Sequence, residues 1–261
     1  MAERCLSGRV ALITGASRGI GRGIAEELAR CGAAVLINFR RDASAAAEVV
    51  ERIEARGGRA AAIQASVSER AEVDRLAAKA SAIFGVVDIL VANAGIASRG
   101  LPVAETEPEE LERVMSTHAF SVHRLTHLLL PEMRKRPRAD IVVISSSELN
   151  HMRANGAPYN MAKAALEALA LTLSKEEIGN GIHVNIVAPG LVSTDMGARL
   201  VKAKLGIEDM TALDERQPLG RVCRPEDVAT VVRFLCTQDA SYVTGQRLVV
   251  DGGADASPTG G

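Results

Sequence analysis

The chain has 261 residues, of which 47% are hydrophobic and 24% charged, a composition typical of a globular protein long enough to bury a core. Its 31 Lys and Arg residues balance 32 Asp and Glu residues, and aromatic residues make up only 2%, which argues against nucleic-acid partners, anionic membranes and stacking platforms for bases. The cysteines form no Cys-x-x-Cys pair, the first residues form no apolar signal region, and no apolar run reaches membrane-spanning length, so we expect a cytoplasmic protein with reduced thiols.

Short apolar runs alternate with helical periodicity along the whole chain. The apolar runs predict seven strands, at residues 9–13, 33–38, 59–64, 87–91, 141–144, 182–188 and 247–250. Apolar residues at helical spacing predict helices at residues 20–28, 44–56, 73–83, 108–136, 158–178 and 228–235. Pro131 is expected to kink or end the long helix at 108–136.

This alternation predicts an α/β fold in a single domain spanning residues 1–261. We expect a doubly wound, seven-stranded, mostly parallel sheet with helices on both faces, and a flexible tail at residues 254–261. In such sheets the ligand lies beyond the carboxyl ends of the strands. The loops that follow the predicted strands are therefore the candidate binding segments.

A glycine-rich turn follows the first predicted strand and opens the first predicted helix. It reads Thr-Gly-Ala-Ser-Arg-Gly-Ile-Gly over residues 14–21, with Gly15, Gly19 and Gly21. Glycines let the backbone turn tightly and let a helix N-terminus approach an anion. A plain tight turn is the alternative, but the position in the first strand–helix unit favours a dinucleotide pyrophosphate.

The end of the second predicted strand indicates which dinucleotide is bound. An acidic residue there would bind the adenosine ribose and favour NAD, but Phe39 stands at this position and Arg40 and Arg41 follow it. Arg18 lies within the glycine-rich turn. Because guanidinium groups pair well with a 2′-phosphate, these residues favour NADP(H). The alternative is that Arg40 and Arg41 form a solvated loop pair.

Three residues in the second half of the chain predict a catalytic site. Tyr159 and Lys163 form a Tyr-x-x-x-Lys motif, which places both side chains on one face of a predicted helix. A tyrosine hydroxyl has a pKa of about 10, and a cation one turn away would lower it. Ser146 follows the fifth predicted strand, where its hydroxyl could orient a substrate carbonyl. Each feature can arise by chance alone, but their combination after these strands favours catalysis.

Together these motifs resemble the short-chain dehydrogenase/reductase family over residues 6–253. The resemblance implies a Rossmann-type fold, a nicotinamide cofactor and catalysis by Ser146, Tyr159 and Lys163. Thr194 would then bond the nicotinamide carboxamide. The cofactor-binding residues that the resemblance and the arginines together indicate are Gly15, Ser17, Arg18, Gly19, Ile20, Gly21, Arg40, Arg41, Ser66, Val67, Asn93, Ala94, Gly95, Tyr159, Lys163, Pro189, Gly190, Val192 and Thr194.

Two residues depart from the family pattern. Ser66 stands where the family usually has an Asp that contacts the adenine, and its hydroxyl can still form a hydrogen bond. His118 stands where the family has an Asn that shapes a helix irregularity and holds a water for proton relay. His118 could hold that water and titrate near neutrality, or it could be a structural substitute. His123 and His127 have helical spacing, but no third ligand is evident, so we expect no metal site.

The segment at residues 191–218 is expected to cover the substrate, because it mixes apolar and basic side chains in a long connection. The chain looks most like the β-ketoacyl-acyl-carrier-protein reductase branch, which implies reduction of a 3-oxoacyl thioester, free or bound to a carrier protein. The same resemblance implies a homotetramer or homodimer. A small, cyclic or polyketide-type ketone or alcohol is the alternative substrate. A catalytically silent NADP-sensing protein is the alternative of another class.

Overall fold

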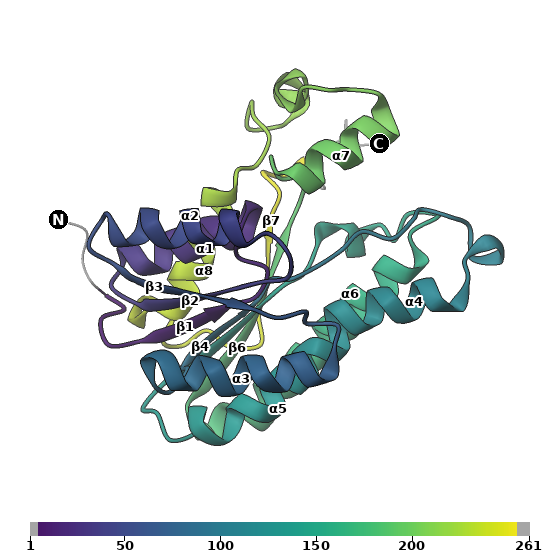
Figure 1. Cartoon of the computed structure of the whole chain (residues 1–261). Coiled ribbons are helices and arrows are strands. Elements are labelled where there is room, and N and C mark those ends of the chain that lie inside the picture. Colours follow the sequence, from purple (N-terminus) through teal and green to yellow (C-terminus); the bar gives the residue numbers. More distant parts are fainter. Residues whose placement is uncertain (1–4, 255–261) are drawn as a thin grey trace.

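The computed structural model describes residues 5–254 (Figure 1). Within them, seven strands form one sheet in the order β3-β2-β1-β4-β5-β6-β7, and each pairing is parallel. The strands are β1 (Val10–Ile13), β2 (Ala34–Phe39), β3 (Arg59–Gln64), β4 (Ile89–Ala92), β5 (Ala139–Ile144), β6 (Ile182–Pro189) and β7 (Arg247–Val250). The predicted parallel sheet is confirmed. Of the predicted flexible tail at residues 254–261, all but Ala254 lies outside the described residues.

Helices cover both faces of the sheet (Figure 1). One face carries α1 (Gly19–Arg30), α2 (Ala43–Glu54) and α8 (Pro225–Cys236). The other carries α3 (Arg70–Phe84), α5 (Ser121–Met133) and α6 (Ala157–Glu176), with α4 (Pro108–Met115) packed on α6. Neighbouring strand residues such as Leu12 and Ile13 point into two different cores. Because both faces are covered, the central strands are apolar throughout, as parallel strands usually are.

The predicted helix at residues 108–136 is interrupted, but Pro131 does not interrupt it. α4 ends at Met115, a π-helical turn occupies Ser116–Phe120, and α5 runs through Pro131 to Met133. The proline removes only one hydrogen bond, close to the end of a helix that many buried apolar side chains hold in place. The real irregularity is the π turn, which inserts an extra residue and directs His118 into the protein.

The predicted covering segment, residues 191–218, contains α7 (Asp195–Leu205) and a 3-10 turn, η5 (Met210–Arg216). Buried Val201, Met210 and Leu213 form a small core of their own, separate from the two main cores. In Figure 1 this part of the chain rises beyond the end of β6. Further short 3-10 turns are η1 (Val103–Glu105), η3 (Ser147–Asn150), η4 (Ile178–Asn180) and η6 (Gln238–Ala240).

The strand order determines where a ligand can bind. β1 pairs with β2 on one side and with β4 on the other, so the chain leaves the centre of the sheet in opposite directions. A crevice therefore opens beyond the carboxyl ends of these strands. The glycine-rich loop, Arg40, Asn93 and Ser146 follow β1, β2, β4 and β5 in turn, so the topology brings them to one edge.

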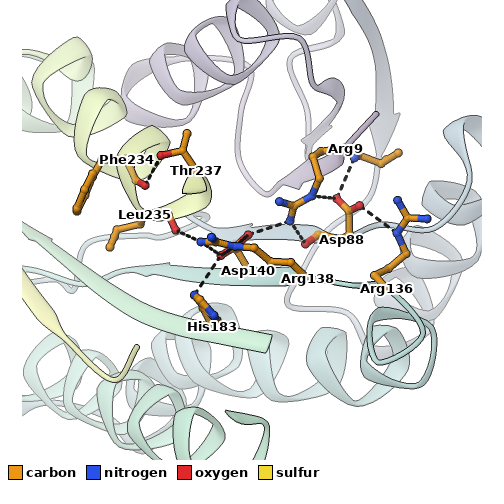
Figure 2. Close-up of polar contacts among 10 residues, drawn as sticks. Arg9, Asp88, Arg136, Arg138, Asp140, His183, Phe234, Leu235 and Thr237 are labelled. Atoms are coloured by element: carbon orange, nitrogen blue, oxygen red, sulfur yellow. Dashed lines mark hydrogen bonds and ion pairs between the residues drawn. The ribbon is translucent and has the colours of Figure 1, made fainter. Parts of the chain in front are cut away.

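A buried ion network ties the sheet together at the opposite edge (Figure 2). Asp88, just before β4, has a fully buried carboxylate that lies 2.9 Å from Arg9 Nε and 3.2 Å from Arg136 Nε. Asp140, in β5, lies 2.8 Å from Arg9 and 2.9 Å from Arg138. Carboxylates are stable in such a place only when cations and hydrogen-bond donors surround them. The network therefore links β1, β4 and β5 far from the binding edge.

Candidate active site

The glycine-rich loop between β1 and α1 adopts a backbone conformation that favours glycine. Gly15 and Gly19 have φ angles of +64° and +56°, in the left-handed region. A Cβ on Gly21 would lie 2.5 Å from Asn93 Nδ2, so no side chain fits there. Asn93 Nδ2 donates to the carbonyls of Thr14 and Gly15 at 2.8 and 3.1 Å. Two predicted cofactor segments, the glycine-rich loop and the loop after β4, therefore form one unit.

The N-terminus of α1 has donors available for an anion. Arg18 occupies the N-cap without a side-chain capping bond, and no acidic residue lies in the first turn. The first N–H groups of a helix have no partner within the helix, and the helix dipole is positive there. A Cβ on Gly19 would lie 3.3 Å from Thr194 Cγ2, so predicted residues from both sides of the crevice meet here. This donor set fits a pyrophosphate.

A polar cavity of about 480 Å³ lies beside the ends of β2 and β3. It contains the predicted residues Arg40, Arg41 and Ser66, whereas Arg18 lies outside its lining and 3.8 Å from Asp195. The rest of the lining was missed by the sequence analysis: Gln64, Ser68, Glu69, Glu72 and Arg75. Ser68, Glu69 and Glu72 lie between the predicted strand at 59–64 and the predicted helix at 73–83, whereas Gln64 ends that strand and Arg75 lies within that helix. Three guanidinium groups around one cavity suit a phosphate group.

The loop after β3 is held by a carboxylate although residue 66 is a serine. The Ser66 N–H donates to Glu72 Oε2 at 2.6 Å, and the Ser66 and Ser68 hydroxyls are 2.9 Å apart. Val67, between them, is buried in the core. The family pattern would place an acidic group at residue 66. In this chain Glu72 supplies an acidic group in the same cavity.

Ser146, Tyr159 and Lys163 converge beyond the end of β5. Ser146 Oγ accepts a hydrogen bond from the Glu148 N–H at 3.2 Å, and Ser146 lies close enough to Tyr159 to act on the pKa of its hydroxyl. Lys163 lies one turn after Tyr159 on α6, and its Nζ is 5.8 Å from the centre of the Tyr159 ring. The same Nζ donates to the Ile144 carbonyl at 2.6 Å. The structure thus brings together the three residues predicted to be catalytic.

Burial dominates the acid–base properties of this cluster. It raises the pKa of Tyr159, while the hydrogen bond from Ser146 acts in the opposite direction. It lowers the pKa of Lys163 to about 7, although the negative charge of Glu167 opposes the change. The pKa of Tyr159 is therefore raised and not lowered as expected, because desolvation of its buried hydroxyl is the largest cause.

His118 is a buried, neutral neighbour of Tyr159. The two rings meet edge to face, with centroids 5.6 Å apart and planes at 84°. His118 Nε2 lies 2.9 Å from the Ile96 carbonyl and 3.1 Å from the Ile96 N–H, and a Cβ on Gly95 would lie 2.7 Å from the ring. Burial lowers the pKa of His118 to about 3, and the positive charge of Lys163 adds to the effect. The expectation that it titrates near neutrality is therefore wrong.

The segment after β6 closes the crevice opposite the glycine-rich loop. A Cβ on Gly190 would lie 2.8 Å from Asp251 Cβ, so the chain passes tightly against the end of β7. Val192 is buried in the core below. Thr194, predicted as a carboxamide ligand, serves as the N-cap of α7 and accepts from the Gly197 N–H at 3.1 Å.

Two further features concern metals and membranes. Across residues 5–254, no three His, Cys, Asp or Glu side chains form a group able to hold a metal ion, and His123 and His127 lie on the exposed side of α5. In the same range, no helix combines the length and apolar character needed to cross a bilayer.

Comparisons with known proteins find relatives over nearly the whole chain. A family model described as Enoyl-(Acyl carrier protein) reductase matches residues 15–255. The 3-oxoacyl-[acyl-carrier-protein] reductase of Synechocystis sp. is 37% identical over 249 residues, which is 95% of this chain and 97% of that protein.

Solved structures resemble the fold over nearly its whole length. A putative NAD(P) dependent gluconate 5-dehydrogenase from Beutenbergia cavernae, with bound NADP, has a TM-score of 0.87 and 37% identity over 97% of this chain and 99% of that one. An angucycline C-6 ketoreductase with bound NADP has a TM-score of 0.85 and 36% identity over 95% of this chain and 96% of that one. The chain therefore belongs to the short-chain dehydrogenase/reductase family and is an NAD(P)-dependent oxidoreductase.

Proposed function

We propose that this protein is an NADP(H)-dependent ketoreductase that reduces the 3-keto group of a 3-oxoacyl thioester to a secondary alcohol. The assignment as a carbonyl reductase rests on one observation, the proximity of Ser146 and Tyr159 beside buried Lys163. The thioester is supported by the relative from Synechocystis sp., which is named as a 3-oxoacyl reductase and aligns with nearly the whole chain.

The residues present fit a dinucleotide with a 2′-phosphate. The uncapped N-terminus of α1 would hold the pyrophosphate, and the cavity with Arg40, Arg41 and Arg75 would hold the adenosine phosphate. Similar structures contain NADP, which supports the same choice. When bound, the nicotinamide supplies the hydride in reduction and accepts it in oxidation.

The chain's own residues manage the proton and the developing charge. In the proposed reduction, the Tyr159 hydroxyl donates its proton to the substrate oxygen as negative charge builds there. The Ser146 hydroxyl donates a hydrogen bond to the same oxygen and so orients the carbonyl. In its ammonium form, Lys163 one turn away would favour the phenolate that proton donation leaves on Tyr159. In the reverse direction the phenolate removes the alcohol proton.

We propose that residues 191–218 cover the substrate. α7 follows β6 directly and exposes the apolar side chains of Met196, Leu200 and Leu205, which suit an acyl chain or a hydrophobic ring. The segment packs around its own small core, so it can move as a unit when substrate enters.

The initial rate of NADPH oxidation with an acetoacetyl thioester tests this proposal, with NADH as the parallel cofactor. We expect turnover with NADPH to exceed turnover with NADH. A crotonyl thioester is the control for reduction of a carbon–carbon double bond, and we expect no turnover with it. Absence of acetoacetyl reduction, with NADPH bound, would overturn the thioester assignment.

Two alternatives keep specific support. The similar angucycline ketoreductase supports a cyclic or polyketide-type ketone, so a panel of cyclic ketones is the next assay. A silent NADP-sensing protein is supported only by the departures at Ser66 and His118. NADPH binding without turnover on any carbonyl would favour that second alternative.

We also propose that the chain forms a homotetramer or homodimer. Large apolar side chains such as Phe120, Ile178 and Tyr242 are more than half exposed, and their burial would drive association. Light scattering of the purified protein tests this expectation, and a monomer at micromolar concentration would contradict it.

A further inference from the structure

An ion pair between two residues that are far apart in the chain lies next to Ser146 and Lys163. Glu167 is one turn beyond Lys163 on α6, and Arg247 is the first residue of β7. Glu167 Oε1 accepts hydrogen bonds from Arg247 Nε at 2.8 Å and from the Ser145 hydroxyl at 2.5 Å. Both ionic side chains are largely buried, with 14% and 24% of their surface exposed. Neither residue is among those assigned to the cofactor or to proton transfer above.

Arg247 also reaches the catalytic serine itself. Its Nη2 donates to the backbone carbonyl of Ser146 at 3.0 Å, while its Nε is engaged with Glu167. A guanidinium group has several donors in one rigid plane, so one arginine can hold a carboxylate and a carbonyl at a fixed separation. The Ser145 hydroxyl, one residue before the catalytic serine, is held by the same carboxylate. The Ser146 carbonyl is thus anchored to Arg247 of β7, and the hydroxyl of the preceding residue, Ser145, is anchored to Glu167 of α6.

We propose that Glu167 and Arg247 are positioning residues for catalysis, which fix the backbone of Ser146 and balance the charge around the Lys163 ammonium. This inference rests on the proposed roles of Ser146 and Lys163. It adds a requirement that the last strand of the sheet be docked before the active site is complete.

The charge balance follows from the groups that face Lys163. On α6 these are Tyr159, which is neutral, and Glu167, which favours the ammonium form. β5 contributes the Ile144 carbonyl, and the π turn contributes neutral His118. Glu167 is therefore the one negative charge acting on Lys163 among the described residues, and Arg247 offsets part of it.

Two neutralising substitutions should act on Lys163 in opposite directions. Glu167→Gln removes the carboxylate and leaves the Arg247 cation, so the pKa of Lys163 falls below its value of about 7. Arg247→Gln removes the cation and leaves Glu167 unpaired, so the pKa of Lys163 rises. Removing a nearby negative charge lowers the pKa of an ammonium group, and removing a nearby positive charge raises it. Opposite signs would show that both charges act on Lys163, and the kinetics of the variants test the positioning of Ser146.

The test is a pH titration of the Lys163 side-chain nitrogen by NMR in the free protein, with the resonance assigned through Lys163→Arg. It needs no substrate, so failure of the thioester assay would leave it intact. Arg134→Gln is the matched control, because Arg134 pairs with buried Glu177, the C-cap residue of α6. Opposite shifts for Glu167→Gln and Arg247→Gln, with no shift for Arg134→Gln, are the expected result.

Kinetics of the same variants separate the two roles. Arg247→Lys keeps the positive charge but cannot hold both acceptors, so Lys163 should titrate as in the wild type while kcat falls about 10-fold. The KM for NADPH should stay unchanged. Shifts of the same sign in the two Gln variants, or a wild-type kcat for Arg247→Lys on a carbonyl substrate that the wild type reduces, would overturn the inference. Should a Gln variant fail to fold, Arg247→Lys and Glu167→Asp still test the backbone role through kcat.

Discussion

Asp88 provides a test of fold stability that is separate from the proposed catalytic chemistry. Its carboxylate is fully buried, accepts from the Val10 N–H at 3.0 Å, and lies within 3.2 Å of both Arg9 and Arg136. Asp88→Asn preserves the shape and removes the charge. Breaking a buried ion pair by removing one partner costs about 3–5 kcal/mol, because the other charge stays buried.

The arrangement of the two arginines refines this figure. In the variant, Arg9 still forms its ion pair with Asp140 at 2.8 Å. Arg136 is 38% exposed, so its unpaired charge can turn towards water. We therefore expect a loss near the lower end, about 3 kcal/mol, against a total stability of about 5–15 kcal/mol. Urea unfolding followed by circular dichroism measures it, and the midpoint should fall by about 1 M.

Controls distinguish stability from function. Glu132→Gln removes an exposed ion pair with Lys135 and should leave the unfolding midpoint unchanged. The kcat of folded Asp88→Asn should match the wild type, because Asp88 directly precedes β4 and so lies at the end of the sheet opposite the candidate active site. A loss of less than about 1 kcal/mol would refute the reasoning about buried charge. An unchanged midpoint with reduced kcat would refute the separation of the two edges.

Three further predictions concern the active site. Tyr159→Phe should lower kcat by at least about 100-fold while NADPH binding, followed by fluorescence, is kept. His118 has a pKa of about 3 in the folded protein and near 6.5 when unfolded, so the unfolded chain binds the extra proton between these values. Stability should therefore fall as pH drops below about 6.5, by about 1.4 kcal/mol per unit from this group, and His118→Asn should remove that part of the slope in urea titrations. Replacing both Arg40 and Arg41 by Gln should lower the ratio of kcat/KM for NADPH over NADH by at least about 10-fold, and an unchanged ratio would place the 2′-phosphate elsewhere.

Much of the fold could be predicted because it depends on local patterns. The alternation of apolar runs and helical stripes predicted the seven strands and their parallel pairing, since only covered parallel strands are apolar on both faces. Element ends shifted by one or two residues in most cases; β2, for example, ends at Phe39 rather than at residue 38. The exception was the helix at 108–136, which a π turn at Ser116–Phe120 divides into two helices.

The grouping of the three candidate catalytic residues could be predicted for a similar reason. Tyr159 and Lys163 are one helical turn apart, and Ser146 follows a strand, so short-range geometry and the topology of a parallel sheet place them together. Their acid–base behaviour could not be predicted in this way. The pKa values of Lys163 and His118 depend on how completely the folded chain excludes water from them, which spacing along the sequence does not encode.

The sequence by itself determined the elements, the glycine-rich loop and the three catalytic candidates, because each rests on residues that are near one another in the chain or at the ends of adjacent strands. The tertiary structure alone decided which distant side chains support them. Glu167 and Arg247 are 80 residues apart, and Arg75 on α3 lines the same cavity as Arg40, which lies in the loop after β2. Such contacts arise only when helix packing and strand order bring separate segments together, and they determine the charge that each catalytic group experiences.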